Sequence, residues 1–574
     1  MKYGERHGHA LAGQQAKPAE QASHDLVPQS GKPKIAKKTA VQPASLVGRL
    51  AGAGSVKGVV AAGHEATANA GKQILEAGGN AVDATIASAL AGCVAEPLLT
   101  GLGAGGYMLV HDTKTNEQKI FDFGVVMPGF GLKETGRELA ELKPTPVDFG
   151  GGVVQMFHGG HASVGVPGFV AGLCAAHKEY GSLPLTELVK PAQELAKKGS
   201  KVTAQQEYLI KILSGVIAVT PASEELFNSR GKLLKEDDNY YCREIISTLE
   251  EIARTNGKSF YQGELAHTLL KEMDAGGGYI TSEDLAKYQV VSRKPAQINY
   301  RGYKIITNPP PTSGGALIAH SLSLLSHFDL KKMGWHSQEH LIHLLSAMLV
   351  TNTVRKDLFD KSAHEEDILE KLLAAKLIED GKAKMSSRLG NTTHLSVIDS
   401  RGNAVSMTTS NGSGSGVAVP GTGILLNNIL GEEDLNPLGF HKYSAGHRMT
   451  SMMSPSIVTH SGQVELSVGS AGSNRIRSAV LQVISAVLDF DKSINQAINA
   501  PRIHTEGKGS AVELEKGIPQ AIAERLSKEG YPVNIWKDIN LFFGGVQAVT
   551  RNPKTGELSG AGDPRRGGVA VVAK

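Results

Sequence analysis

The chain is poor in cysteine, and its few cysteines are scattered. Its 574 residues include only Cys93, Cys174 and Cys242, and no two of them form a C-x-x-C pair. Such a set predicts no disulfide framework, so a reducing compartment is compatible with the sequence. Cys93 and Cys174 lie in apolar runs of helical spacing, and we interpret them as packing residues.

Aromatic residues and unbalanced charge are also scarce. Aromatics make up 5% of the chain, and the formal net charge is only +4. A nucleic-acid-binding protein usually clusters Lys and Arg beside aromatics, so no nucleic-acid partner is predicted. No apolar run is long enough to span a membrane. The first fifteen residues lack the apolar segment of a secretory signal. We therefore expect no membrane partner and a cytoplasmic location.

The N-terminal region lacks hydrophobic periodicity. Residues 1–57 are rich in Gln, Ala, Pro and Lys, and they include the basic stretch G-K-P-K-I-A-K-K. This composition is typical of a disordered tail. Attraction of the basic stretch to an anionic surface is the alternative interpretation.

Glycine, in contrast, is abundant, and one cluster imitates a nucleotide-binding motif. Residues 101–106 read G-L-G-A-G-G, which fits G-x-G-x-x-G. A dinucleotide site needs a strand before the glycines and a helix after them. Here a helical pattern precedes them and a strand-like run, residues 107–111, follows. We therefore predict a tight, close-packed connection and no dinucleotide cofactor.

Three histidines fall on one helical face. His336, His340 and His343 follow helical spacing, but the chain has no H-E-x-x-H motif and no carboxylate at the usual spacing. Packed or exposed histidines are therefore predicted in place of a metal site.

The most informative segment is residues 391–412, N-T-T-H-L-S-V-I-D-S-R-G-N-A-V-S-M-T-T-S-N-G. Two strand-like runs flank a polar turn, which predicts a β-hairpin. A threonine hydroxyl is a weak nucleophile without a neighbouring base. If the chain is cut before Thr392, its own α-amine, with a pKa of about 8, can accept the hydroxyl proton.

Apolar periodicity outlines the remaining elements. Residues 66–94 read as two helices broken at Gly78-Gly79, and residues 167–389 are mostly helical with an extended insert at 290–307. Beyond Thr392 the pattern alternates with period two in short strands and then gives helices near 477–490 and 520–529. Strands from both halves with flanking helices favour stacked sheets covered by helices.

Many ordered segments together carry a family resemblance. They begin at Gly63 (G-H-E-A-T-A-N-A-G), Glu96 (E-P-L-L-T-G-L-G), Ser163, Tyr180, Ile280, Asn308 (N-P-P-P-T-S-G-G), Thr392, Gly423, Ser451, Gly469 (G-S-A-G-S-N-R-I) and Gly562. From about Val59 to its C-terminus the chain resembles the γ-glutamyltranspeptidases (glutathione hydrolases), which are autoprocessing N-terminal-nucleophile hydrolases. The resemblance implies an α+β fold, the four-layer αββα sandwich.

The resemblance also implies a cut between Asn391 and Thr392. The expected products are a large chain, residues 58–391 after the tail, and a small catalytic chain, residues 392–574. They would form a heterodimer, and a dimer of two heterodimers is an open alternative. The implied partners are a small-molecule amide and an acceptor, water or an amine, and no cofactor is expected.

Individual site residues are carried over from the family motifs. The resemblance makes Thr392 the nucleophile and assigns the oxyanion hole to the backbone amides of Gly472 and Ser473. It assigns Ser410 and Asn411 to holding the nucleophile and substrate, Glu432 to the substrate α-amine, and Ser451 to its α-carboxylate. The second residue of the carboxylate-binding pair is Met452 where the family has serine.

One departure bears on specificity. The family has D-F-R-E where this chain has D-F-G-V, so Gly124 stands in place of the arginine that binds the α-carboxylate. The expected function is a γ-glutamyltransferase or glutathione hydrolase. The alternative is an acylase for an oxamate, a cephalosporin side chain or a specialised-metabolite amide. An unprocessed, non-enzymatic binding relative is the alternative from another class.

Overall fold

The structure is a computed structural model that describes residues 56–148, 154–374, 377–378, 392–507 and 509–574. Nearly all of the predicted tail, residues 1–55, and the predicted cleavage residue Asn391 lie outside these described residues.

Two β-sheets form the centre of the fold. The first has the strand order β10-β3-β2-β14-β13-β1-β24, and the second has the order β11-β12-β17-β18-β22-β23. The first sheet contains β1 (Gly58–Ala62), β2 (Gly105–Asp112), β3 (Glu117–Phe123), β10 (Val291–Arg293), β13 (Thr393–Asp399), β14 (Ala404–Ser410) and β24 (Val569–Ala573). The second contains β11 (Ala296–Tyr300), β12 (Tyr303–Thr307), β17 (Ser456–His460), β18 (Gln463–Ala471), β22 (Gly545–Arg551) and β23 (Leu558–Gly562).

Both sheets contain strands from before and from after residue 392. Strand β1 pairs with β13 on one side and with β24 on the other, and both pairings are antiparallel. In the second sheet, β12 pairs with β17. Each sheet is therefore built from both halves of the chain.

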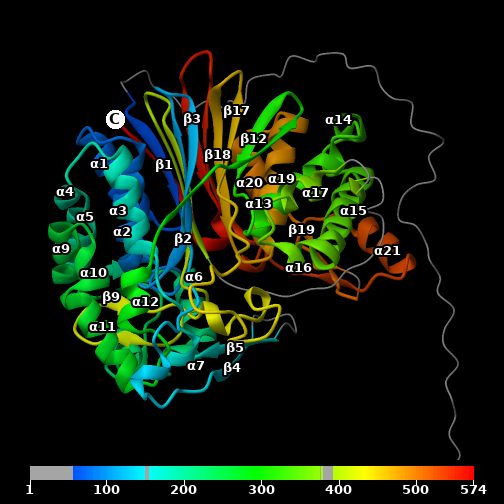
Figure 1. The fold of residues 1–574 in the computed structure, drawn as a ribbon. Coiled ribbons are helices and arrows are strands. Elements are labelled where there is room, and N and C mark those ends of the chain that lie inside the picture. Colours follow the sequence, from blue (N-terminus) through cyan, green and yellow to red (C-terminus); the bar gives the residue numbers. More distant parts are fainter. Residues whose placement is uncertain (1–55, 149–153, 375–376, 379–391, 508) are drawn as a thin grey trace, which may run out of the picture. The chain divides into compact units, whose positions relative to one another are not determined.

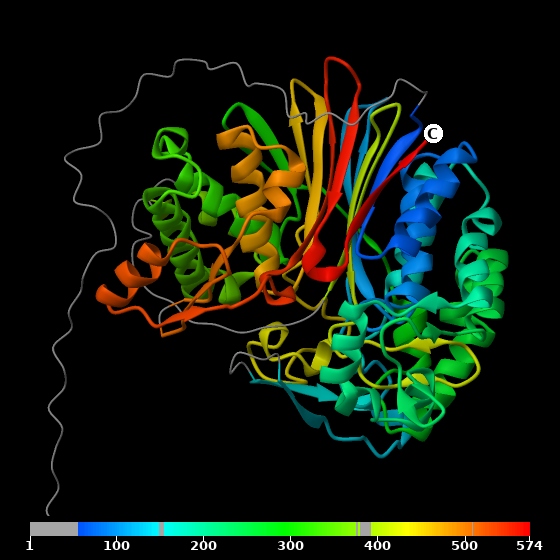
Figure 2. The ribbon, with the colours of Figure 1, turned by 180° about the vertical axis from the view of Figure 1, so that it is seen from behind.

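Helices cover the outer face of each sheet. The first sheet is covered by α1 (Glu65–Glu76), α2 (Ala81–Ala95) and α3 (Phe169–Tyr180), and the second by α13 (Ser313–Leu325) and α19 (Arg475–Phe490). The inner faces of β13 and β14 pack against β18 and β22. Figures 1 and 2 show the resulting order of helix, sheet, sheet and helix. The predicted αββα sandwich is confirmed.

The remaining elements surround these layers. The other helices are α4 (Leu185–Leu188), α5 (Lys190–Lys198), α6 (Ala204–Ile212), α7 (Ser214–Ile217), α8 (Pro221–Leu226), α9 (Ile245–Thr255), α10 (Lys258–Gln262), α11 (Glu264–Ala275), α12 (Ser282–Lys287), α14 (Leu330–Met333), α15 (Gln338–Val354), α16 (Asp360–Ser362), α17 (Ile368–Leu373), α20 (Ile494–Asn499) and α21 (Gln520–Lys528). Two-residue strands between residues 200 and 240, such as β6 (Ser200–Lys201) and β9 (Asn239–Tyr240), interrupt the region predicted as helical. Within the described ranges, no helix has the length and apolar character needed to cross a membrane.

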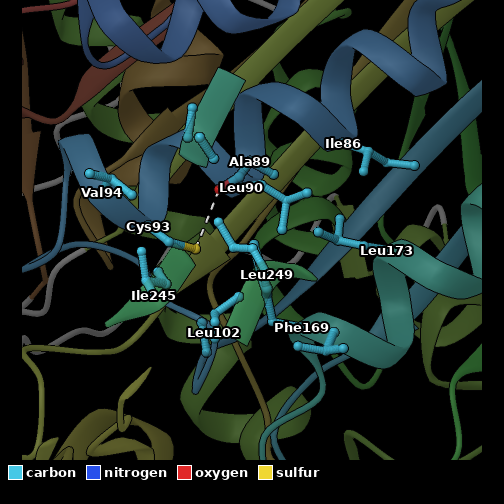
Figure 3. Packing of buried hydrophobic residues seen from close by; sticks show 14 of the residues in the cluster. Ile86, Ala89, Leu90, Cys93, Val94, Leu102, Phe169, Leu173, Ile245 and Leu249 are labelled. Carbon is cyan, nitrogen blue, oxygen red and sulfur yellow. Dashed lines mark hydrogen bonds between the residues drawn. The ribbon is translucent and has the colours of Figure 1, made fainter. Parts of the chain in front are cut away.

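The core under the first sheet centres on α2. All fifteen residues of this helix are buried, which matches its nearly continuous apolar sequence. An Asn80–Asp83 capping box starts the helix and explains the break predicted at Gly78-Gly79. Cys93 packs here among aliphatic side chains, and its Sγ lies 3.5 Å from the Ala89 carbonyl oxygen (Figure 3). The prediction that Cys93 is a packing residue is confirmed.

The glycine cluster that leads into β2 is a close-packed connection, as predicted, and its last two glycines are the first residues of the strand. A Cβ on Gly103 would lie 2.4 Å from the Leu425 carbonyl oxygen, and one on Gly106 would lie 2.5 Å from that of Thr408. Both contacts are shorter than real Cβ atoms make, so side chains there would separate neighbouring backbones. The glycines therefore serve packing of the sheet.

The three histidines lie in or next to α15. The His340 ring packs 4.6 Å from that of Phe490, and burial lowers the His340 pKa to about 3. His343 uses Nδ1 in a 2.8 Å hydrogen bond with the Glu339 carbonyl oxygen. These contacts tie the histidines to protein groups.

Candidate active site

Thr392 stands directly before β13, in the middle of the first sheet, and is 4% exposed. In the register of β13 and β14, Thr393 faces Thr409, so the next pair outward is Thr392 and Ser410. Ser410 in turn faces Gly105 on β2. Thr392 and Ser410, which the sequence predicts to act together, therefore lie in one row across the sheet.

Side chains along β13 alternate between the helix layer and the second sheet. Thr393 points to the helices, where its Oγ1 donates to Glu96 Oε2 over 2.8 Å. The His394 ring points the other way, 2.3 Å from the position of a Cβ on Gly469 of β18. Continuing the alternation, the Thr392 side chain faces the second sheet.

The predicted oxyanion turn follows β18. Gly472 has φ +118 and Ser473 has φ +49, and α19 begins two residues later at Arg475. A Cβ on Gly472 would lie 2.9 Å from Gly544 Cα, so this position requires glycine. Both residues precede the first turn of a 16-residue helix, where backbone amides and the helix dipole favour negative charge.

A short chain of contacts joins this turn to the start of β13. The Arg566 Nη2 atom lies 3.4 Å from the position of a Cβ on Gly472. Arg566 and Glu96 line the same small cavity, of about 20 Å³, together with Gly63. Glu96 then binds Thr393. The oxyanion turn and the predicted nucleophile therefore lie at the same edge of the sandwich.

Asn411 has a side-chain oxygen that accepts no hydrogen bond from the described residues. Its backbone N–H donates to the Leu99 carbonyl oxygen over 3.2 Å, and its carbonyl oxygen accepts from Asn428 N over 3.0 Å. Its side-chain Oδ1 is buried without a hydrogen-bond partner among the described residues. A buried amide oxygen of this kind is unfavourable unless a ligand donates to it.

Glu432 is buried beneath the loop that follows β14. Its Oε1 accepts from Ser413 Oγ over 3.4 Å, and a Cβ on Gly412 would lie 2.7 Å from the same oxygen. Burial, with a contribution from the Asp434 charge, raises the Glu432 pKa to about 8. Its assignment to the substrate amine stays a prediction.

Asp434, which the sequence analysis missed, contacts the oxyanion turn. Its Oδ2 accepts from Ser473 Oγ over 3.1 Å, while its Oδ1 is buried with no partner among the described residues. Burial raises the Asp434 pKa to about 6, and the Arg355 charge opposes this shift. The run E-E-D at residues 432–434 holds three acids in succession, and Asp434 lies two residues beyond the acid that the motif predicts.

Ser451 and Met452 lie beside the start of α13. The Ser451 Oγ accepts from Met453 N over 3.0 Å, and its carbonyl oxygen accepts from Ser313 N over 2.9 Å. Met452 is buried and its Sδ lies 2.8 Å from Ser313 Oγ. The pair is therefore held by the second helix layer, with an apolar side chain in its second position.

A distant arginine fills the space beside Gly124. Arg448 donates through Nη1 to the Gly124 carbonyl oxygen and, over 2.8 Å, to Tyr288 Oη. Its Nη2 donates to the Gln289 carbonyl oxygen over 2.6 Å, and its Nε lies 3.7 Å from Asp122 Oδ1. These contacts use three of the five N–H donors of the guanidinium, so protein groups already hold Arg448 beside Gly124.

An apolar cluster adjoins this arginine. It consists of Val125, Met127, Ile429, Leu430, Leu435 and Met449, with Tyr443 packed against it. Among the described residues, no group of three or more His, Cys, Asp or Glu side chains is arranged to hold a metal ion.

The raised Glu432 pKa predicts a pH-dependent stability. The folded state binds the Glu432 proton more tightly than the unfolded chain, whose pKa is near 4.5. This contribution is complete below pH 4.5 and is lost as the pH rises to 8. As the pH rises, the free energy of unfolding should therefore fall less steeply in Glu432→Gln than in the wild type. The two slopes should differ by at most about 1.4 kcal/mol per pH unit. Urea unfolding of both proteins at pH 5 and 8 measures this, and parallel pH dependences would contradict it.

Comparisons with known proteins agree on one family. The family model described as gamma-glutamyltranspeptidase matches residues 67–573. The chain is 34% identical over 528 residues to the glutathione hydrolase proenzyme of Escherichia coli K12, covering 85% of this chain and 87% of that protein. It is 33% identical over 515 residues to the acylase ACY 1 proenzyme of Pseudomonas sp. SE83, covering 86% and 89%. The crystal structure of cephalosporin acylase from Bacillus halodurans superposes with a TM-score of 0.77 at 27% identity, covering 95% and 98%.

Proposed function

Because the chain belongs to the γ-glutamyltranspeptidase family of enzymes, we propose that it is an autoprocessed amide-cleaving acyltransferase with Thr392 as its nucleophile. Its proposed substrate is a γ-glutamyl amide, and the acyl group passes to water or to an amine. The observation that carries the proposal is that contacts through Glu96 and Arg566 connect the Thr392 strand end to the Gly472–Ser473 turn.

In the maturation step, the Thr392 hydroxyl attacks the carbonyl carbon of Asn391. The peptide C–N bond breaks, an ester forms, and the released α-amine of residue 392 takes the proton. Water then hydrolyses the ester and regenerates the hydroxyl. The products are a chain that ends at residue 391 and a chain that begins at residue 392.

In the catalytic step, the same hydroxyl attacks the substrate amide while the α-amine accepts its proton. The backbone amides of Gly472 and Ser473 stabilise the negative oxygen of the tetrahedral intermediate. The α-amine returns the proton to the leaving amine, and water or a second amine then takes the acyl group. This sequence requires no cofactor.

The two products remain paired as a heterodimer in this proposal. Support comes from β1, which lies between β13 and β24, because separating the chains would break hydrogen bonds on both sides of that strand. The dimer of two heterodimers stays an alternative that analytical ultracentrifugation distinguishes.

Asp434 and Asn411 are the proposed receptors of a substrate amine. Each carries one buried oxygen without a partner among the described residues, Asp434 Oδ1 and Asn411 Oδ1. An ammonium has three donors and a positive charge, so one placed between these oxygens has enough donors for both. Asp434 also binds the oxyanion turn through Ser473, which Glu432 does not. We therefore propose Asp434 in place of Glu432 as the primary amine ligand.

This assignment predicts a pH dependence. The Asp434 pKa is raised to about 6, so the carboxylate is neutral below that pH and cannot pair with an ammonium. For an acyl anilide that carries an amine, the ratio of its kcat/KM to that of its amine-free analogue should fall as the pH drops through 6. Asp434→Asn should lower the ratio roughly tenfold or more above pH 6 and remove the transition. An unchanged ratio in Asp434→Asn would assign the amine to another group, and Glu432→Gln is then the matched variant.

A second candidate is an acylase for amides that lack an α-carboxylate. The observation that favours it is the state of Arg448, which uses three of its five N–H donors on Gly124, Tyr288 and Gln289. Met452 and the apolar cluster at Val125 add no compensating donor. A carboxylate buried without donors is unfavourable. A Cβ at position 124 would lie 2.8 Å from Tyr107 Oη, so an arginine cannot simply be restored there.

Four anilides separate the two candidates, because they vary the amine and the carboxylate independently. These are γ-glutamyl (both groups), 4-aminobutyryl (amine only), glutaryl (carboxylate only) and butyryl (neither) anilides. If Arg448 is unavailable, adding the carboxylate to the 4-aminobutyryl compound should change kcat/KM by less than about threefold, whereas a bidentate arginine contact would give roughly tenfold or more. A strong preference for the γ-glutamyl compound would establish the first candidate and assign a cation to the carboxylate.

A further inference from the structure

The Glu96 carboxylate lies directly behind the start of β13, the strand that follows Thr392. Its Oε2 accepts from Thr393 Oγ1 over 2.8 Å, and its Oε1 accepts from Thr67 Oγ1, also over 2.8 Å. Thr67 belongs to the first turns of α1. One buried carboxylate thus ties the beginning of β13 to the helix layer.

This carboxylate occupies a costly position. Glu96 follows the last residue of α2, where the helix dipole disfavours negative charge, and it is 4% exposed. The surroundings are fitted to it nevertheless. A Cβ on Gly63 would lie 2.3 Å from Glu96 Oε2, and the Arg566 guanidinium lines the same cavity. A neutral side chain would be less costly here, which points to a role for the carboxylate in the site.

Cleavage creates the need for such a contact. Once the bond before residue 392 is cut, Thr392 becomes a chain terminus, and termini fray unless they are tied down. Thr393 points away from the substrate side, so binding its hydroxyl restrains the strand end without obstructing the Thr392 face. The facing residue Thr409 is held too, with Oγ1 3.2 Å from Thr100 Oγ1.

We propose that Glu96 is a positioning residue that acts through Thr393. It holds the cut end of β13 so that the hydroxyl and α-amine of residue 392 keep their attacking geometry. The inference rests on the proposed function, because it assumes that residue 392 is the nucleophile and the new N-terminus.

Thr393→Val and Thr67→Val form a matched pair of tests. Each variant removes one hydroxyl that donates a 2.8 Å hydrogen bond to the Glu96 carboxylate. Of the two residues, only Thr393 lies on β13, the strand that follows the nucleophile. Thr393→Val should be cleaved and should lose roughly tenfold in kcat on the best of the four anilides, with KM within twofold. Thr67→Val should keep kcat at least fivefold above Thr393→Val. Thr393→Ser, which restores the hydroxyl, should recover most of kcat.

Intact mass and thermal unfolding of each protein complete the design. A Thr393→Val protein that is uncut, while Thr67→Val and Thr393→Ser are cut, also supports the proposal. The reason is that the Thr392 hydroxyl makes the attack in maturation as well as the attack on the substrate. If Thr393→Val does not fold, Gly63→Ala takes its place, since its methyl group would push on Glu96 Oε2. Wild-type kcat in a cleaved Thr393→Val would overturn the positioning role alone. An uncut, inactive wild type would overturn the proposed function as well.

Discussion

Thr392→Ala is expected to yield one uncut chain of 574 residues without measurable amidase activity. Both the maturation step and the catalytic step use the Thr392 hydroxyl, so a single substitution removes both. Loss of a nucleophile typically lowers kcat roughly ten-thousandfold or more. Intact-mass spectrometry measures the cleavage, and release of the aniline from the preferred anilide measures the activity.

Thr392→Ser is the matched control, because it retains a hydroxyl at the same place and should still be cut. The Thr392 side chain is buried at the start of an inner strand, outside its hydrogen-bonded residues, so the alanine variant should keep the fold, as circular dichroism can verify. A wild-type chain that is uncut yet fully active would rule out the N-terminal-nucleophile mechanism. An uncut and inactive wild type would support a non-enzymatic binding relative.

Gly472→Pro is expected to lower kcat by roughly a hundredfold to a thousandfold. Proline removes one of the two proposed oxyanion donors and fixes φ near −65°, whereas Gly472 has φ +118. Steady-state kinetics on the cleaved enzyme measures the loss. Processing itself forms a tetrahedral intermediate, so slower cleavage of the precursor is a second expected result.

Ser473→Gly provides the control for this turn. Glycine accepts φ +49 and keeps the backbone N–H, so oxyanion stabilisation should remain and kcat should stay within a few-fold of wild type. The variant does delete the hydroxyl that donates to Asp434, so any change should appear in the binding of amine-bearing substrates. An equal, large loss of kcat in both variants would instead implicate the Ser473 hydroxyl in the chemistry.

Local patterns predicted the framework well. The Thr392 hairpin, the two helices around Gly78-Gly79 and the short strands beyond Thr392 all depend on periodicity and turn residues within a short window. The order of two sheets and two helix layers followed from the family resemblance. The short strands between residues 200 and 240 were missed because two-residue pairings leave no periodic signal.

The site was less predictable because its contacts are distant in sequence. Arg448 is 324 residues from Gly124, and Thr393 is 297 residues from Glu96, so neither pairing has a local signature. The choice between Glu432 and Asp434 depends on which acid reaches the oxyanion turn. The path of the loop after β14 sets the distance between each acid and the turn. Residue types alone do not reveal that path.

The pairing of strands from the two halves of the chain has a consequence for how large and small chains can combine. Strand β1 is bonded on both edges to strands from beyond residue 392, so the large and small chains of the proposed enzyme cannot exchange partners without unfolding. Each mature molecule would keep the two halves of its own precursor for life. A substitution in one chain would therefore always act together with the other chain of the same precursor. In a mixture of two variants, the mature enzymes would not exchange chains to form hybrid heterodimers.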